Sequence, residues 1–350
     1  MISTLETALD GILEQPLELA RAHGSATGYV GFDLPLDVLL SSNRHCCHLP
    51  WQAGRSTPQA DQWLETAFPG WARSILQDWI EGQFDCFDRV IFTRGDDAIQ
   101  RLYYYICELQ RQKQIAGPRP LIFDVTTIVR DSSRSHCRLA VQKLLQQLEI
   151  AEDALPAGIA AANRMRSVYG NWHRLRPVAG RIHDKLARAL LFHDCTTLLD
   201  NSHSPEKPPV QGVLLVGSDP PDESLHLAVE AAGWDVTGEV YQRTLGRFGR
   251  QLDPDDGIAA VADLCHSQQN GPRSFTSLVA RVKQAMVDSD PAAIVLWLAE
   301  EDEALAWQVP GLDRLFKTSG LPALKLVRRD WHGRDDSSAQ ITDFLRGLLP

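Results

Sequence analysis

The sequence contains no run of eighteen apolar residues, so no transmembrane helix is expected. Its N-terminal stretch MISTLETALDGILEQ has amphipathic spacing and lacks the basic start and apolar centre of a signal peptide. Basic residues are outnumbered by acidic ones, giving a formal net charge of -10, which argues against a general nucleic-acid binder. We therefore expect a soluble cytoplasmic protein that binds neither a membrane nor nucleic acid.

Paired cysteines are also lacking. The seven cysteines are odd in number and scattered, with no CxxC pair, which argues against a disulfide framework and a zinc ribbon. His45-Cys46-Cys47-His48 has the composition of a ligand cluster. In a strand, however, neighbouring side chains point to opposite faces, so we expect two buried thiols that cannot share a metal.

The common catalytic signatures are absent. There is no GxGxxG, no Walker lysine, no GxSxG, no HExxH and no kinase motif. These absences leave the reaction class open. We assign no catalytic residue and predict no metal site.

The most informative stretch that is present runs from Val210 to Val240. Its apolar segment VLLVG predicts a strand covered on both faces, and a turn, a helix and a second strand follow. This order is typical of a parallel βαβ unit, in which ligands bind beyond the carboxyl ends of the strands. Gly217, Ser218 and Asp219 are therefore candidate ligand-binding residues, although an ordinary βα turn has the same pattern.

Buried strands and helices alternate along the rest of the chain. The expected strands are Gly28–Leu34, His45–Leu49, Arg89–Thr93, Pro120–Val125, Val213–Gly217, Trp234–Val240, Ala292–Ala299 and Leu321–Val327. This alternation predicts an α/β protein with two small doubly wound parallel sheets, of Rossmann or flavodoxin type.

A helical segment separates the two predicted sheets. We expect a helical lead-in over residues 1–27, a first α/β domain over 28–150, a helical connector over 151–205 and a second α/β domain over 206–350. The proline-rich stretch His203–Pro209 is the best candidate linker.

Acidic residues follow one predicted strand in each half. Gly95, Asp96 and Asp97 follow Arg89–Thr93, in the place that Gly217–Asp219 occupies in the second half, and Glu301 and Asp302 follow Ala292–Ala299. Such residues could bind a cation or act as acid and base, but a helix cap is the simpler explanation for Asp96 or Asp97, and a solvated loop is favoured for Glu301 and Asp302. If both turns face one cleft, mutual repulsion will raise some carboxyl pKa values or recruit a cation.

From about Gly28 to the end, the order of segments resembles the 2-hydroxyacyl-CoA dehydratase family, which includes the benzoyl-CoA reductase core subunits. The resemblance is carried by FPGWARSILQDWIEGQFDCFDRVIFTRGDDAIQRLYYY, NWHRLRPVAGRI, VLLVGSDPPDESLHLAVEAAGWDVTGEVY, and AAIVLWLAEEDEALAWQVPGLDRLFKTSGLPALKLVRRDW followed by AQITDFLRGLL. The resemblance implies two α/β domains around a helical connection, with a [4Fe–4S] cluster in the cleft between them.

In that family, three cysteines from three loops hold the cluster. The corresponding loops here read Phe68-Pro69-Gly70, Gly95-Asp96-Asp97 and Glu301-Asp302, without a cysteine. Iron–sulfur clusters need thiolates, whereas carboxylates suit magnesium, calcium or manganese. We therefore expect no cofactor.

The resemblance and the missing ligands lead to three hypotheses. The first is a cluster-less, non-redox partner or accessory subunit, forming a homodimer or a heterodimer with a cluster-bearing homologue. The second is an enzyme or binding protein whose acidic interdomain cleft holds an acyl-CoA or phosphate-bearing ligand with a divalent cation. The third is an intact iron–sulfur dehydratase with unrecognised ligands such as Cys46, Cys47 and Cys86.

Overall fold

The computed structural model describes residues 2–42, 44–126, 128, 130–200, 211–267 and 277–349. It contains two four-stranded parallel sheets, one in each half of the chain, with helices on both faces of each. This confirms the expected α/β class with two small doubly wound sheets. Among the described helices, none combines the length and the apolar character needed to span a membrane.

The first sheet has the strand order β2-β1-β3-β4, and its strands are β1 (Ala26–Val30), β2 (His45–His48), β3 (Arg89–Thr93) and β4 (Arg119–Phe123). The second sheet repeats this order as β6-β5-β7-β8, with strands β5 (Gly212–Gly217), β6 (Asp235–Val240), β7 (Ala293–Ala299) and β8 (Ala323–Arg329). In both sheets the strand order reverses next to the first strand, which is where doubly wound folds form a ligand crevice.

The first strand differs from the expectation. The sequence predicted Gly28–Leu34, but β1 starts two residues earlier and ends at Val30. The reason is Gly31, whose φ of +105° turns the chain out of the sheet. The predicted linker His203–Pro209 and the boundary at 205 and 206 lie outside the described residues.

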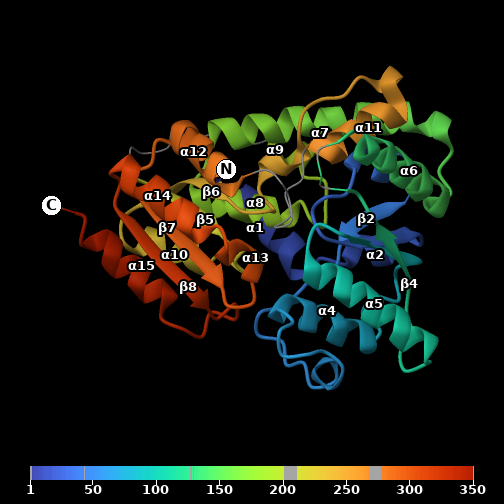
Figure 1. Ribbon diagram of the computed structural model, residues 1–350, viewed down its shortest axis with the longest axis horizontal. Coiled ribbons are helices and arrows are strands. Elements are labelled where there is room, and N and C mark those ends of the chain that lie inside the picture. Colours follow the sequence, from blue (N-terminus) through green and yellow to red (C-terminus); the bar gives the residue numbers. More distant parts are fainter. Residues whose placement is uncertain are drawn as a thin grey trace.

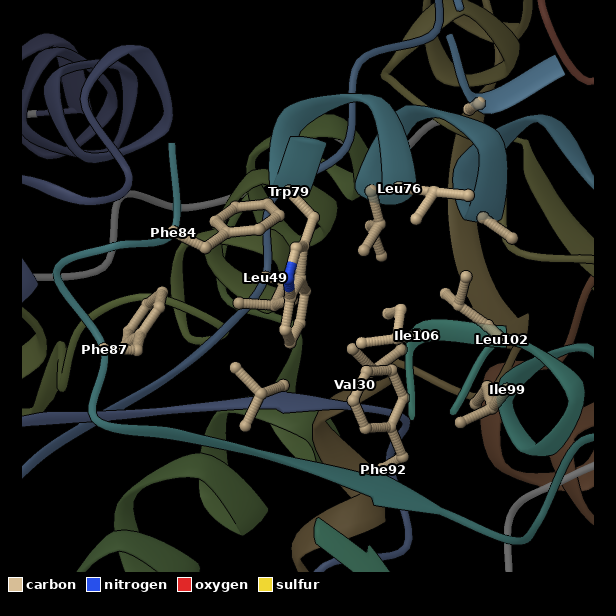
Figure 2. Packing of buried hydrophobic residues seen from close by; sticks show 14 of the residues in the cluster. Val30, Leu49, Leu76, Trp79, Phe84, Phe87, Phe92, Ile99, Leu102 and Ile106 are labelled. Carbon is tan, nitrogen blue, oxygen red and sulfur yellow. The ribbon is translucent and has the colours of Figure 1, made fainter. Parts of the chain in front are cut away.

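One face of the first sheet is covered by the helices α2 (Glu18–His23), α4 (Gly70–Ile80) and α5 (Asp97–Arg111). Figure 2 shows this core, in which Trp79 and Leu76 from α4 and Ile106 from α5 lie over Val30 and Phe92 of the sheet. The indole N–H of Trp79 donates to the Ala116 carbonyl at 2.9 Å, which satisfies its one polar atom.

The other face of the first sheet packs against α3 (Leu36–Leu39), α6 (Asp131–Leu148), α7 (Leu155–Leu175) and α11 (Gly257–Ser267). The helix α11 comes from the second half of the chain, yet it lies beside α6 in the first half (Figure 1). The chain thus crosses back between the halves, which ties the two sheets together.

The second sheet is covered on one face by α10 (Ser224–Ala231) and α15 (Ser337–Arg346), and on the other by α12 (Leu278–Ser289), α13 (Glu303–Ala306) and α14 (Val309–Ser319). A separate helical layer packs α1 (Ile2–Glu14), α7, α8 (Gly180–Ala189) and α9 (Thr196–Asp200) together. The long helix α7 runs along the top of Figure 1, across both halves of the molecule.

Candidate functional site

A cavity of about 240 Å3 lies where the carboxyl ends of the strands in both sheets meet. The first half contributes residues that follow β1, β2 and β3, and the second half contributes residues that follow β5, β6, β7 and β8. Because loops of both sheets line the same space, the cavity lies between the two halves. This is the position in which doubly wound folds bind ligands.

Ser218 and Asp302 form the polar centre of the second half's side. The Ser218 hydroxyl donates to Oδ2 of Asp302 at 2.7 Å and accepts the backbone N–H of Ala299 at 3.1 Å. The turn after β5 is thereby fixed to the turn after β7. Ser218 is only 5% exposed and Asp302 is half-buried, so both line the cavity rather than standing in bulk water.

Asp219 is held by the turn after β6. Its carboxylate accepts the backbone N–H groups of Gln242 at 3.2 Å and of Arg243 at 3.1 Å. The guanidinium of Arg243 lies 3.9 Å from Asp219 and is itself 1% exposed. Asp219 therefore holds the ends of β5 and β6 together, which makes it a positioning group at least as much as a ligand group.

Asp96 faces the cavity from the first half. Its Oδ1 accepts the backbone N–H of Ala98 at 2.6 Å and of Ile99 at 3.4 Å, so it caps α5. The alternative prediction from the sequence, that this residue caps a helix, is thus confirmed. Asp96 also lines the cavity together with Asp97. The residue that caps α5 is therefore also a candidate site residue.

Negative charge is crowded in this cavity. Among the residues that the structure describes, one guanidinium lines it, that of Arg101, which is already paired with Glu65. Six described carboxylates face it: those of Asp96, Asp97, Asp219, Glu301, Asp302 and Glu303. Burial raises the pKa of Asp302 to about 6, with further raising by the charges of Asp96 and Asp219. Burial also raises the pKa of Glu301, whose Oε2 is buried without a hydrogen-bond partner in the described structure.

Aromatic side chains form the remaining walls. They are Phe32, His48, Trp51, Trp71 and Trp331. His48 is fixed as a neutral ring, because the Gly31 N–H donates to its Nε2 at 3.1 Å while its Nδ1–H donates to the Leu49 carbonyl at 2.6 Å. Burial lowers the pKa of His48 to about 3, so it adds no positive charge to the cavity.

In each half, a glycine with a positive φ lies at the end of the first strand or directly after it. Gly217 ends β5 with a φ of +131°, and Gly31 follows β1 with a φ of +105°. The counterpart of Gly217 is therefore Gly31, and the sequence-based placement of Gly95 as that counterpart was wrong. Gly95–Asp97 follow β3 and correspond to the acidic residues that follow β7. Sequence alone missed this because the letters of the two halves show no close repeat.

The family resemblance raises the question of a [4Fe–4S] cluster, and the residues present do not fit one. Pro69, Asp96 and Asp302, one from each of the three relevant loops, all line the cavity, but no cysteine does. Cys46 and Cys47 lie on opposite faces of the first sheet, as expected from strand geometry. Since iron–sulfur clusters need thiolates, the donors here do not suit the group.

Six of the eight predicted site residues line this one cavity: Asp96, Asp97, Ser218, Asp219, Glu301 and Asp302. Gly95 and Gly217 are not among the lining residues, and Gly217 shapes its turn instead. The sequence interpretation missed the aromatic walls. Phe32, Trp51 and Trp331 each stand two or three residues beyond a strand, which is a signal that would have found them.

Comparison with known proteins adds no further assignment. No protein-family model matches the chain, and no curated protein matches it significantly.

Proposed function

We propose that this protein is a cluster-less relative of the 2-hydroxyacyl-CoA dehydratases that works without redox chemistry, as a partner or accessory subunit of an acyl-CoA dehydratase or reductase system. The observation that carries the proposal is the convergence of three loops on one interdomain cavity. Pro69, Asp96 and Asp302 line this cavity, and they belong to the loops that the resemblance pairs with the family's cluster loops. Two α/β halves around one cavity are the scaffold that the resemblance implies, and the described lining of this cavity contains no sulfur donor.

The donor chemistry supports the non-redox part of the proposal. The cavity offers carboxylates, one hydroxyl and neutral aromatic rings, and these are hard or apolar groups. Soft iron–sulfur centres are not stabilised by such a set. A protein of this kind would contribute a surface that binds the ligand or the other subunit. Electron transfer would stay with the cluster-bearing subunit.

The test is to purify the full chain anaerobically and to measure iron, acid-labile sulfide and visible absorbance. We expect no iron–sulfur absorbance and iron far below stoichiometry. Co-expression with a cluster-bearing dehydratase subunit should then give a complex that co-elutes in size-exclusion chromatography, with all of its iron in the other chain. Stoichiometric iron in the isolated chain, or two subunits that never co-elute, would overturn the proposal.

A second function is favoured by the charge of the cavity. Six carboxylates beside one paired arginine would repel an acyl-CoA or phosphate-bearing ligand unless a cation lay between them. The alternative is therefore a binding protein or enzyme that takes such a ligand together with a divalent cation, held by Asp96, Asp97, Glu301 and Asp302. Carboxylate oxygens are the donors that magnesium and manganese prefer.

This alternative makes a separable prediction for thermal unfolding. Acyl-CoA and Mg²⁺ together should raise the midpoint by more than the sum of their separate effects, because each creates part of the other's site. Asp302→Asn should remove this synergy, and the exposed control Asp153→Asn should keep it. Equal shifts for both variants, or no shift at ligand concentrations far above typical dissociation constants, would count against the alternative.

A further inference from the structure

A second cavity, of about 350 Å3, lies beside the loop that follows β1, and Gly31 and Phe32 line both cavities. Its other walls include residues of α3, α7, α11 and the short 3-10 helix η3 (Leu245–Phe248). The helices η3 and α11 belong to the second half of the chain, whereas α3 follows β1 in the first half. The second cavity is therefore also a space in which residues from both halves meet.

Aliphatic side chains are the largest group in the lining of the second cavity. They include Leu34, Leu36, Leu39, Leu40, Met165 and Leu190, which we call the leucine-rich wall. Within this wall, Leu39, Met165 and Leu190 are buried. Covering such a surface with a hydrocarbon chain is favourable, because it removes apolar area from water.

Arg247, in η3, brings a positive charge to this apolar space. Its guanidinium lies 4.6 Å from the ring of Phe248 and 5.9 Å from that of Phe32, and it donates one hydrogen bond, to the Arg243 carbonyl at 2.6 Å. Burial lowers the pKa of Arg247, so water solvates the charge poorly. In the described structure none of its nitrogens is both buried and unpartnered, so the donors that protein leaves unused reach open space.

Two other arginines line the second cavity, but each already has a carboxylate partner. Arg166 holds Asp37 with two hydrogen bonds of 2.7 Å and 2.6 Å, and Arg44 is paired with Asp88. Within the described part of the chain, no carboxylate lies within ion-pair distance of Arg247. An anion that enters this cavity therefore has the guanidinium of Arg247 to bind.

The two carboxylates in the lining are engaged with other groups. Asp194 accepts a hydrogen bond from the Tyr169 hydroxyl. Burial lowers the pKa of Arg281, and the charge of Asp33 opposes this lowering, so Asp33 lies near a second arginine. Neither carboxylate neutralises Arg247, but both repel anions, which favours a ligand with a single negative charge over a dianion.

We propose that the second cavity binds an aliphatic carboxylate, with its head group on Arg247 and its chain along the leucine-rich wall. A guanidinium matches a carboxylate with two parallel hydrogen bonds. Such a pair is stronger in a poorly hydrated site than in water. The inference does not rest on the proposed function, since it concerns another cavity and its ligand is measured directly.

The first test compares octanoate, octanol and octyl phosphate as ligands of the full chain, by thermal unfolding and isothermal titration calorimetry. Octanoate should raise the unfolding midpoint in a concentration-dependent manner. Octanol lacks the charge, and octyl phosphate carries up to about two negative charges. Both should bind at least about tenfold more weakly than octanoate. Equal or tighter binding of either compound, or no binding of octanoate, would overturn the proposal.

The second test removes the guanidinium. Arg247→Met keeps an unbranched apolar side chain, so the variant should fold and its affinity for octanoate should fall at least about tenfold. The matched control is Arg250→Met, which changes an exposed arginine in the same segment and should leave the affinity unchanged. A folded Arg247→Met that binds octanoate as tightly as Arg250→Met would contradict the assignment.

The third test locates the ligand in the wild-type protein and so does not depend on a variant that folds. A fatty acid with a diazirine group in its chain is photo-crosslinked to the full chain, and the labelled residues are identified by mass spectrometry. Labels should fall on the leucine-rich wall and should disappear when octanoate is present in excess. Labels on Trp71 or Trp331, which line the first cavity, or labels that octanoate does not displace, would refute the proposed site.

Discussion

The hydroxyl of Ser218 and the carboxylate of Asp302, 2.7 Å apart, join the ends of two neighbouring strands in the second sheet. The bond matters because Asp302 belongs to the acidic side of the interdomain cavity, where burial and the charges of Asp96 and Asp219 raise its pKa. Ser218 opposes that rise by donating a hydrogen bond to the ionised form. The balance between these effects sets the protonation state of the cavity.

The first prediction concerns the pH dependence of stability. An aspartate in the unfolded chain has a pKa of about 3.9, whereas that of Asp302 in the folded protein is raised to about 6. Between these values the folded state holds a proton that the unfolded chain has released. The free energy of unfolding should therefore fall as pH rises from about 4 to 6, by up to about 2–3 kcal/mol, and then level off.

Asp302→Asn should remove this contribution. The variant should be more stable than the wild type at pH 8, and the difference should disappear near pH 4. Urea unfolding at several pH values measures both. Asp153→Asn, at an exposed position that does not line the cavity, is the control and should follow the wild-type curve. A parallel pH dependence of Asp302→Asn and wild type would show that Asp302 does not titrate in this window.

The second prediction concerns the buried ion pair between α3 and α7. Arg166 holds Asp37 with two hydrogen bonds of 2.7 Å and 2.6 Å, and the two residues are 4% and 0% exposed. Replacing one partner leaves the other charge buried and unpaired, so Asp37→Asn should lower the free energy of unfolding by about 3–5 kcal/mol. The double variant Asp37→Leu with Arg166→Met should cost less than the sum of the two single changes. Additive losses in urea unfolding would contradict this coupling.

The third prediction concerns the turn that presents Ser218. At Gly217, where φ is +131°, an added Cβ would lie 2.0 Å from the Trp297 carbonyl oxygen. Gly217→Ala should therefore lower the free energy of unfolding by more than about 2 kcal/mol, through backbone strain and displacement of β7. Gly11→Ala is the matched control, because no atom lies within 4 Å of its added Cβ. Helix propensity predicts that it stabilises α1 by about 0.5–1 kcal/mol, measured by the same unfolding experiment.

The fourth prediction tests whether the cavity corresponds in position to the family's cluster site. If Pro69, Asp96 and Asp302 occupy the cluster loops, their combined replacement by cysteine should let the chain bind iron and sulfide on anaerobic reconstitution. Visible absorbance and iron content give the readout. The wild type, with all seven of its native cysteines, is the control and should stay colourless. A folded triple variant that binds no iron would mean that these positions are not cluster positions.

The sequence by itself determined where helices and strands form. The apolar core Val90–Phe92 predicted β3 with its observed bounds, Arg89–Thr93, because strands covered on both faces leave no polar alternation at their centre. Strand periodicity placed Cys46 and Cys47 on opposite faces, as observed. Acidic residues shortly after β3 and β7 were recognised as site candidates because the carboxyl ends of parallel strands share one edge of a sheet.

Only the tertiary structure decided which of these residues meet. The hydrogen bond from Ser218 to Asp302 joins residues far apart in the chain, and nothing local encodes it. The aromatic walls come from strand ends in both halves, and α11 packs across onto the first sheet. The lining of the second cavity likewise has no sequence motif, because elements from both halves supply it. Local patterns fix periodicity and burial, whereas sites depend on contacts between distant segments that only the packed fold specifies.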